Sequence, residues 1–364
     1  MIPNKHIENI LPYVPGKPIE EVKRELGLKS VVKLASNENN RGIPEVVVKK
    51  LEKKIADLFL YPDGSLYELR KILALKYAVT ESQLVFGNGS DEILQLLALA
   101  YLSAEKEVLI SEGTFSEYEF CARLVNASFL KVPLKDFTYD LQAFAQAVTA
   151  KTAVIFLCNP NNPTGTYFSQ QELVSFLDSI SSDILVVIDE AYYEYAVGDD
   201  YPESLSLLSK YKNIIILRTF SKIWTLAGLR IGYSLSSEEI AKSLNKARQP
   251  FNVNRFAEVA ALAMLEEKGW VEAVLKDINA EKEYFYKEFE KLGLKYLPSK
   301  TNFIFLFLPI PAKQAFEALL KKGIIVRPMN GFGYPDSIRV TIGLREENRL
   351  FIAQLSEILE NNNE

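Results

Sequence analysis

The chain has 364 residues, of which 48% are hydrophobic and 24% are charged, and its formal net charge is -5 at pH 7. The length favours two domains over one core, and the composition is typical of a globular protein. The acidic balance and the lack of basic runs argue against nucleic acid or an anionic membrane as a partner, and no apolar stretch is long enough to span a bilayer.

Cysteine and histidine usage narrows the chemistry further. Cys121 and Cys158 are far apart with no CxxC spacing, so we expect neither a disulfide framework nor a metal site. The first residues lack the apolar core of a signal peptide, and we therefore expect a cytoplasmic protein. His6 is the only histidine, which excludes Ser-His-Asp triads and HExxH zinc sites. Proton transfer must use Lys, Tyr, Asp, Glu or Cys.

The two ends of the chain differ from its middle. Residues 11–18 are proline-rich and cannot form a regular helix or a central strand. We expect residues 1–30 to be an arm that packs on a small domain or on a partner subunit, residues 31–268 to form a large domain, and residues 269–364 to form a smaller α+β domain. The smaller domain is expected to contain one long charged helix and short strands, over residues 270–292, 302–308 and 337–342.

The middle of the chain alternates short apolar runs with helix-length segments. The runs cover residues 84–86, 108–110, 153–157, 184–188 and 214–217, and each leads into a turn that carries polar side chains. Continuous apolar runs of this kind are typical of strands buried on both faces of a mostly parallel sheet. Ligands bind beyond the carboxyl ends of such strands, so we expect these turns to meet at one site.

The last of these runs ends in Arg218-Thr219-Phe220-Ser221-Lys222, with Arg230 eight residues later. A lysine can form a Schiff base with an aldehyde if burial or neighbouring positive charge lowers its pKa. Arg230 can bind a phosphate through two nitrogens, and the hydroxyls of Thr219 and Ser221 can donate to the same oxygens. Taken alone, the segment could equally be a strand that ends in a polar turn.

A second strand end carries Asp189, where an ionised carboxylate is costly unless it is paired. It could pair with a protonated pyridine nitrogen or cap the next helix, and the presence of Lys222 favours the first role. Tyr192 and Asn162 could hydrogen-bond the phenolic oxygen of the same ring. The alternatives are that the tyrosine is a half-buried core aromatic and that the asparagine only stabilises the Asn-Asn-Pro turn. Asn161 is the weaker candidate.

A third strand end runs through Gly89, Ser90 and Asp91 into a helical segment, whose free backbone N–H groups would bind phosphate. Asp91 could instead serve as the capping partner of Asn88.

Aromatic residues follow two further turns. Phe115 or Tyr118 could lie over the face of a planar cofactor, and for Tyr118 we favour packing in the core. Tyr61, in Tyr61-Pro62-Asp63-Gly64, could present its phenol to a phosphate across a dimer interface, or could simply belong to a turn.

Three motifs together, in this order and spacing, resemble the fold-type I pyridoxal-phosphate aminotransferases: Asn159-Pro160-Asn161-Asn162-Pro163-Thr164-Gly165, Asp189-Glu190-Ala191-Tyr192 and Ser221-Lys222 with Arg230. The resemblance covers nearly the whole chain and implies an α/β large domain, with a mostly parallel sheet flanked by helices, plus a smaller α+β C-terminal domain. It implies pyridoxal 5'-phosphate as the cofactor, Lys222 as its covalent anchor and proton carrier, and Asp189 as the partner of the pyridinium. The phenolic oxygen and the phosphate would be bound by Asn162 and Tyr192, and by Ser90, Ser221, Arg230 and Tyr61.

Within that family the chain is most similar to histidinol-phosphate aminotransferases, on the strength of Leu34-Ala35-Ser36-Asn37-Glu38-Asn39, the Tyr61 turn and Ile338-Arg339-Val340-Thr341. This resemblance implies transfer of an amino group between L-glutamate and imidazole-acetol phosphate, which gives L-histidinol phosphate and 2-oxoglutarate. It also implies that Arg339 binds the α-carboxylate of glutamate, and that a homodimer places Tyr61 in the neighbouring site.

The chain departs from the family pattern at two points. Asn40-Arg41 stands where many relatives have proline, and Phe115 stands where many relatives have tyrosine. Phenylalanine can still stack on the ring. Asn37, Tyr13 and Arg41 are our candidates for the substrate end. Asn252 and Asn254 would lie behind them, and a solvated or capping role is an equally open interpretation of Arg41, Asn252 and Asn254.

Three other functions stay open at this point. An aromatic amino-acid aminotransferase would share the scaffold, and a pyridoxal-phosphate decarboxylase of a phosphorylated amino acid would use the same lysine and aspartate. A regulatory module that binds the cofactor without turnover is disfavoured, because no DNA-binding segment is fused to the chain.

Overall fold

The computed structural model describes residues 4–8, 10, 16–198 and 200–362. These residues fall into two compact units. The first combines the N-terminal stretch before residue 12 with Gly42–Asn162 and Tyr167–Lys268, and the second combines the described part of Pro12–Arg41 with Pro163–Thr166 and Gly269–Glu364.

The second unit contains N-terminal residues beyond the expected arm, which was to end at residue 30. Residues 31–41, which we expected in the large domain, belong to the unit that holds the C-terminal quarter. The reason is backbone pairing, because Val32 and Lys33 form a parallel ladder with Ile324 and Ile325. Helix α2 (Ile19–Leu26) covers this ladder, with Val22 buried against Ala35 and Ile325. Residues 11–15 of the arm, Tyr13 included, lie outside the described residues.

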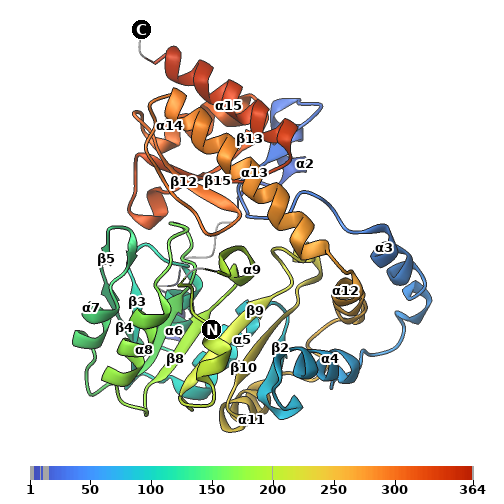
Figure 1. Ribbon diagram of the computed structural model, residues 1–364, viewed down its shortest axis with the longest axis vertical. Helices are drawn as coiled ribbons and strands as arrows, with labels where there is room; N and C mark the ends of the chain where they lie inside the picture. Colours follow the sequence, from blue (N-terminus) through green and yellow to red (C-terminus); the bar gives the residue numbers. More distant parts are fainter. Residues whose placement is uncertain (1–3, 9, 11–15, 199, 363–364) are drawn as a thin grey trace. The chain divides into compact units, whose positions relative to one another are not determined.

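The first unit is built on a mostly parallel sheet flanked by helices, as expected (Figure 1). Within the described residues its strand order is β2-β10-β9-β8-β7-β3-β4, and β10 alone runs against its neighbours. The strands are β2 (Leu84–Gly87), β3 (Glu107–Ser111), β4 (Ser128–Val132), β7 (Thr152–Cys158), β8 (Leu185–Asp189), β9 (Ile214–Thr219) and β10 (Gly232–Ser236). All five apolar runs predicted to be strands lie in this sheet.

The helices of this unit are mostly short, and several of them directly follow strands. They are α1 (Lys5–Glu8), α3 (Glu45–Glu52), α4 (Tyr67–Tyr77), α5 (Ser90–Tyr101), α6 (Glu117–Leu124), α7 (Leu141–Gln146), α8 (Gln170–Ser179), α9 (Tyr193–Ala196), α10 (Ser204–Leu207), α11 (Glu238–Ala247) and α12 (Arg255–Glu266). Single 3-10 turns cover Ile55–Asp57, Glu81–Gln83 and Ala227–Leu229, and a small hairpin pairs β5 (Leu134–Lys135) with β6 (Thr138–Tyr139).

The register of the central strands decides where polar groups meet. Strands β8 and β9 are buried along their whole length, which suits their Val, Ile and Leu content. Cys158 at the end of β7 is the register partner of Asp189 at the end of β8, and Asp189 in turn pairs with Leu217 of β9. The turns after these strands therefore start side by side at one edge of the sheet.

The second unit contains a four-stranded antiparallel sheet in the order β11-β12-β15-β14. Its elements are β1 (Val32–Lys33), α13 (Trp270–Lys291), β11 (Tyr296–Leu297), β12 (Phe303–Phe307), α14 (Ala312–Lys321), β13 (Ile324–Ile325), β14 (Arg327–Pro328), a 3-10 turn (Asn330–Phe332), β15 (Ser337–Thr341) and α15 (Arg345–Glu360). The long charged helix and the strands predicted here are confirmed. No helix among the described residues has the length and apolarity needed to cross a membrane.

Candidate functional site

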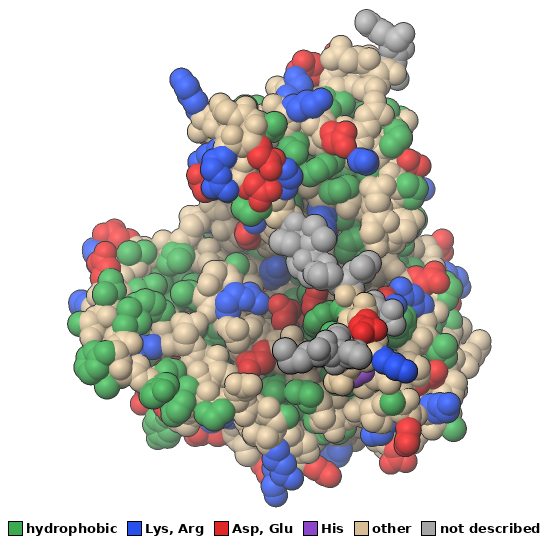
Figure 2. Space-filling model, turned by 180° about the vertical axis from the view of Figure 1, so that it is seen from behind, with side chains coloured by type: hydrophobic (Ala, Val, Ile, Leu, Met, Phe, Trp, Pro, Cys, Tyr) green, Lys and Arg blue, Asp and Glu red, His purple; other side chains and the backbone are tan. Residues whose placement is uncertain are grey.

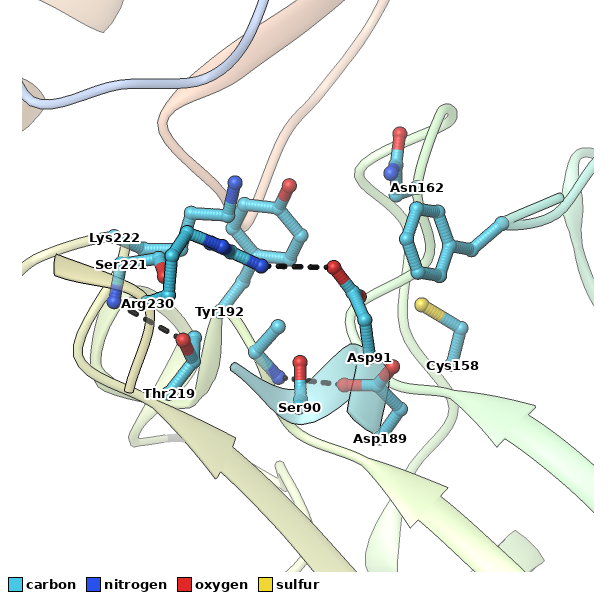
Figure 3. A pocket seen from close by; sticks show the side chains of 12 residues that line it. Ser90, Asp91, Cys158, Asn162, Asp189, Tyr192, Thr219, Ser221, Lys222 and Arg230 are labelled. Carbon is cyan, nitrogen blue, oxygen red and sulfur yellow. Dashed lines mark hydrogen bonds and ion pairs between the residues drawn. The ribbon is translucent and has the colours of Figure 1, made fainter. Parts of the chain in front are cut away.

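A pocket at the carboxyl ends of the central strands collects nearly all the cofactor residues predicted from sequence (Figure 3). Of that set, Gly89 and Tyr61 are the two that do not line it. The lining residues come from the start of α5, the turn after β3, the last residues of β7, β8 and β9, and the segments that follow these three strands: Ser90, Asp91, Phe115, Cys158, Asn162, Asp189, Ala191, Tyr192, Thr219, Ser221, Lys222 and Arg230.

Lys222 reaches the pocket from a short loop after β9. Its Nζ lies 5.5 Å from the centre of the Tyr192 ring, and Figure 3 shows the two side chains next to each other. Two local hydrogen bonds hold the loop in place: the Ser221 N–H donates to Thr219 Oγ1 at 3.0 Å, and the Thr225 N–H donates to the Lys222 carbonyl at 3.0 Å. The backbone that carries the Lys222 amine is therefore held by hydrogen bonds within a short loop.

Asp189 is 3% exposed, and no salt bridge to it exists among the described residues. Its Oδ1 accepts a hydrogen bond from the Ala191 N–H at 3.1 Å, and its Oδ2 accepts one from the Tyr118 hydroxyl at 2.8 Å. Burial raises the pKa of this carboxyl to about 6, against the opposing effect of these two donors and of Lys222. A buried carboxylate in this state is poised to receive a cation.

The N-terminus of α5 forms another wall of the pocket. Gly89 has φ +79°, a backbone conformation that favours glycine, and a Cβ at this position would lie 2.5 Å from Nη2 of Arg230, so a side chain here would displace the guanidinium. Arg230 also donates to Asp91 Oδ2 at 3.0 Å and to the Ala227 carbonyl at 3.2 Å. Backbone N–H groups at a helix start, a hydroxyl from Ser90 and a guanidinium together make an anion site.

The loop that precedes this helix is capped by a residue that sequence reasoning missed. Glu92, and not Asp91, accepts the N–H of Asn88, at 2.6 Å. The alternative role of Asp91 as a capping partner is therefore wrong, because its carboxylate is committed to Arg230.

The same Glu92 oxygen accepts a hydrogen bond from Asn252 Nδ2 at 2.6 Å. Asn252 donates as well to the Phe86 carbonyl at 3.1 Å and accepts from Arg248 Nη1 at 2.7 Å. Its side chain thus braces the loop around residue 88 and does not line the pocket. The suggestion that Asn252 stands behind the substrate is replaced by this bracing role.

The remaining pocket residues lie as the motifs indicated. Asn162 and Tyr192 line the pocket, at 8% and 3% exposure, while Asn161 hydrogen-bonds Thr114 Oγ1 and the Gly113 carbonyl instead. Phe115 also lines it and meets the ring of Tyr118 edge to face, at 5.6 Å between centroids.

The candidates for the substrate end lie in the second unit. The Asn37 N–H donates to Thr341 Oγ1 at 3.0 Å, and Arg339 donates through Nη2 to the Ala35 carbonyl at 2.8 Å. Arg41 forms an ion pair with Asp277 at 2.5 Å. These two hydrogen bonds join the segment that carries Asn37 to the strand that carries Arg339. The binding roles of both residues stay predictions.

Asn254, in the first unit, takes the capping role. Its Oδ1 accepts the Ala257 N–H at 2.9 Å and starts α12, while its Nδ2 donates to the Leu229 carbonyl at 2.9 Å. It is not a pocket residue.

Tyr61 does not line the pocket of its own chain. Its side chain is 77% exposed and stacks on Phe251, with 4.8 Å between ring centroids. Its carbonyl accepts a hydrogen bond from Arg255 Nη2 at 2.7 Å, so the backbone of the turn is held in place while the phenol is exposed.

Two lining residues, Cys158 and Ala191, were not predicted. Tyr118 was expected to pack in the core, and its hydrogen bond to Asp189 was not predicted. The alignment of β7 with β8 could have identified Cys158, because both strands end at the same edge. No sequence signal distinguishes Tyr118 from an ordinary core tyrosine.

Comparison with known proteins identifies the family of the chain. Residues 29–355 match the family model for aminotransferase class I and II. The chain is 49% identical to the histidinol-phosphate aminotransferase of Moorella thermoacetica, over 97% of this chain and 92% of that one, and 45% identical to that of Bacillus subtilis strain 168, over 98% and 99%.

A solved structure extends the match to three dimensions. The histidinol-phosphate aminotransferase of Sinorhizobium meliloti, in complex with pyridoxal-5'-phosphate, superposes with a TM-score of 0.90 at 27% identity and covers 98% of this chain and 97% of that chain. The chain therefore belongs to the class I and II aminotransferase family and, within it, to the histidinol-phosphate aminotransferases.

Proposed function

We propose that this chain is a pyridoxal-phosphate transaminase that moves an amino group between L-glutamate and imidazole-acetol phosphate, to give L-histidinol phosphate and 2-oxoglutarate. The observation that carries this proposal is the meeting of three groups in one pocket. These are the Lys222 amine, the buried Asp189 carboxylate without an ion-pair partner among the described residues, and the anion site at the start of α5.

The residues of the pocket fit the cofactor chemically. A protonated pyridine nitrogen supplies the cation that Asp189 lacks, and a phosphate suits the N–H groups of α5 with Arg230. The glycine at position 89 lets the Arg230 guanidinium lie against the start of α5, since a Cβ there would fill the space that the guanidinium occupies. The donor set therefore matches both charged ends of pyridoxal phosphate.

When bound, the cofactor supplies an electron sink for negative charge at the substrate Cα. Lys222 Nζ holds the cofactor covalently between turnovers and moves a proton at the reacting carbon during them. Asp189 would keep the ring nitrogen cationic, and Phe115 would lie against the ring face. Asn162 and Tyr192 would hold the phenolic oxygen, and Ser90, Thr219, Ser221 and Arg230 would hold the phosphate.

Arg339, Asn37 and Tyr13 are the candidate substrate residues in this proposal. Arg339 is 7% exposed, and its fork of donors suits a carboxylate, so we assign it the α-carboxylate of glutamate. Asn37 and Tyr13 complete this end, the latter by resemblance alone.

The proposal is tested by the absorbance of the cofactor-loaded protein. Glutamate should shift the cofactor band and 2-oxoglutarate should restore it, while a protein that shows no shift is not a transaminase. After borohydride reduction and denaturation, the cofactor should stay attached to the wild-type chain and be lost from Lys222→Ala.

The substrate is tested in single turnovers of the amino form of the loaded enzyme. Imidazole-acetol phosphate should react faster than phenylpyruvate at equal concentration. If phenylpyruvate reacts faster, the chain is an aromatic amino-acid aminotransferase, and if a phosphorylated amino acid releases carbon dioxide, it is a decarboxylase.

We also propose a homodimer in which Tyr61 enters the neighbouring site. An apolar ridge of the first unit, residues 55–61, exposes Ile55, Leu58, Phe59, Leu60 and Tyr61, with Phe59 at 83%. Figure 2 shows hydrophobic side chains gathered over the part of this unit that holds α3 and α4. A second copy of the chain is the occupant we assign, because exposed apolar ridges of this kind mark interfaces and Tyr61 is absent from its own pocket.

Sedimentation velocity tests the dimer. Phe59→Asp should yield monomers, whereas Leu130→Asp, on the edge strand β4 and 40% exposed, should leave the association unchanged. An active, monomeric wild-type protein would refute the proposal. A cytoplasmic location stays a prediction.

A further inference from the structure

Tyr118 is a buried residue to which the proposed function assigns no role. It lies on α6, and its exposed fraction is 0%. Its ring stacks on Phe156 with 4.8 Å between centroids and an angle of 3°, and Phe115 meets it edge to face. The ring is therefore clamped between two aromatic neighbours, which fixes the direction of its hydroxyl.

That hydroxyl donates to Asp189 Oδ2 at 2.8 Å. Because an ionised carboxylate can only accept, the tyrosine must be the donor, and burial together with the nearby Asp189 charge raises the pKa of Tyr118 well above 10. The phenol therefore keeps its proton at any pH at which the protein works.

The other donor to this carboxylate is the Ala191 N–H, on Oδ1 at 3.1 Å. Each oxygen thus receives one fixed donor, and the orientation of the group is defined by two different elements, α6 and the turn after β8. Hydrogen bonds to the ionised form also favour that form over the neutral acid.

We propose that Tyr118 is a positioning residue, which through its hydrogen bond holds the Asp189 carboxylate ionised and oriented to receive a cationic ring nitrogen. This inference rests on the proposed function, in which Asp189 faces the pyridine nitrogen of the cofactor. Tyr118 itself touches neither cofactor nor substrate in this scheme, and it acts only through Asp189.

Tyr118→Phe isolates this effect, because phenylalanine keeps the ring between Phe115 and Phe156 and removes only the donor. Tyr139→Phe is the matched control. Tyr139 is also buried, at 4% exposure, and its hydroxyl bonds Thr114 Oγ1 at 2.8 Å, with no hydrogen bond to Asp189. Both variants lose one buried phenol hydroxyl, and only one of them changes the partners of Asp189.

The experiment compares binding of two probes to the apoprotein at equilibrium. The first is pyridoxal phosphate, and the second is its analogue with carbon in place of the ring nitrogen, which cannot become cationic. The wild-type protein should prefer pyridoxal phosphate. Tyr118→Phe should weaken pyridoxal phosphate binding roughly tenfold, the loss expected for one hydrogen bond to a charged group, and leave analogue binding unchanged. Tyr139→Phe should keep the wild-type preference.

A second variant guards against misfolding as an explanation. In an Asp189→Asn background the preference should already be gone, and Tyr118→Phe should then add no further loss. Unchanged preference in Tyr118→Phe, or an equal loss in Tyr139→Phe, overturns the inference while the proposed function stands. A wild-type protein that binds both probes equally overturns the assignment of Asp189, and the inference falls with it.

Discussion

Arg218 and Glu190 form a buried ion pair next to the pocket, and removal of the arginine alone should be costly. Their side chains are 3% and 0% exposed, and Arg218 donates through Nε and Nη2 to Glu190 Oε2 at 2.9 and 2.7 Å. The guanidinium carbon also lies 3.5 Å from the centre of the Tyr193 ring. In Arg218→Met the carboxylate stays buried and loses its cation together with both hydrogen bonds.

Removing one member of a buried pair typically costs about 3–5 kcal/mol, because the other charge is left without compensation. With a urea m-value near 3 kcal/mol/M, the upper end for small proteins, this loss lowers the unfolding midpoint by about 1 to 1.7 M.

The loss should depend on pH. Burial raises the pKa of Glu190 in the native protein, and Arg218 opposes that rise, so the variant should have a still higher native pKa. An acid whose native pKa exceeds its unfolded pKa binds more protons when folded, and stability then falls as pH rises between the two values. The deficit of Arg218→Met against wild type should therefore grow as pH rises from the raised Glu190 pKa of the wild-type protein to the still higher pKa of the variant, by up to about 1.4 kcal/mol per pH unit.

Urea unfolding of the apoprotein, followed by tryptophan fluorescence at one protein concentration and at two pH values, measures this loss. The control is the double variant Arg218→Met with Glu190→Met, which replaces the pair by apolar side chains and should recover most of the stability. A single-variant loss below about 1 kcal/mol, the size of an exposed pair, would refute the reasoning. So would a double variant no more stable than the single one.

Three further predictions concern cofactor affinity, measured by equilibrium titration with pyridoxal phosphate. Gly89→Ala should weaken binding about tenfold, because its Cβ would lie 2.5 Å from Arg230 Nη2 at φ +79°, whereas Gly228→Ala meets no atom within 4 Å and should bind normally. Asn252→Ala should weaken binding about 3- to 10-fold, because it frees the loop that Glu92 braces. The control, Asn254→Ala, should remove only a helix cap and lower the stability by about 1 kcal/mol. Equal losses of affinity in the two variants would contradict the bracing role. Saturation at 100 times Kd should stabilise the folded protein by about 2.7 kcal/mol, seen as a Tm that falls again when the cofactor is dialysed away.

Much of the fold and most of the pocket could be predicted from sequence, because both depend on local patterns. Runs such as 184–188 are apolar throughout, which is typical of a strand covered on both faces, and Asp189 follows directly at the carboxyl end of this run. Parallel strands end at one edge, so residues placed after them were expected to converge, and they do.

Local sequence patterns do not predict which partner a side chain binds in the folded protein. Asp91 and Glu92 are adjacent acids at one helix start, yet the first pairs with Arg230 and the second with Asn88 and Asn252. The choice depends on how α5 packs against segments more than a hundred residues away in the chain.

The sequence by itself therefore determined the chemistry of this protein: a lysine, an aspartate and an anion site at the ends of buried strands. Tertiary structure alone decided how that chemistry is supported. Tyr118 reads as a core aromatic in the sequence, and it becomes the donor to Asp189 only because α6 brings it to the end of β8. Hydrogen bonds require atoms within about 3 Å, and for residues 71 positions apart only the folded chain sets that distance.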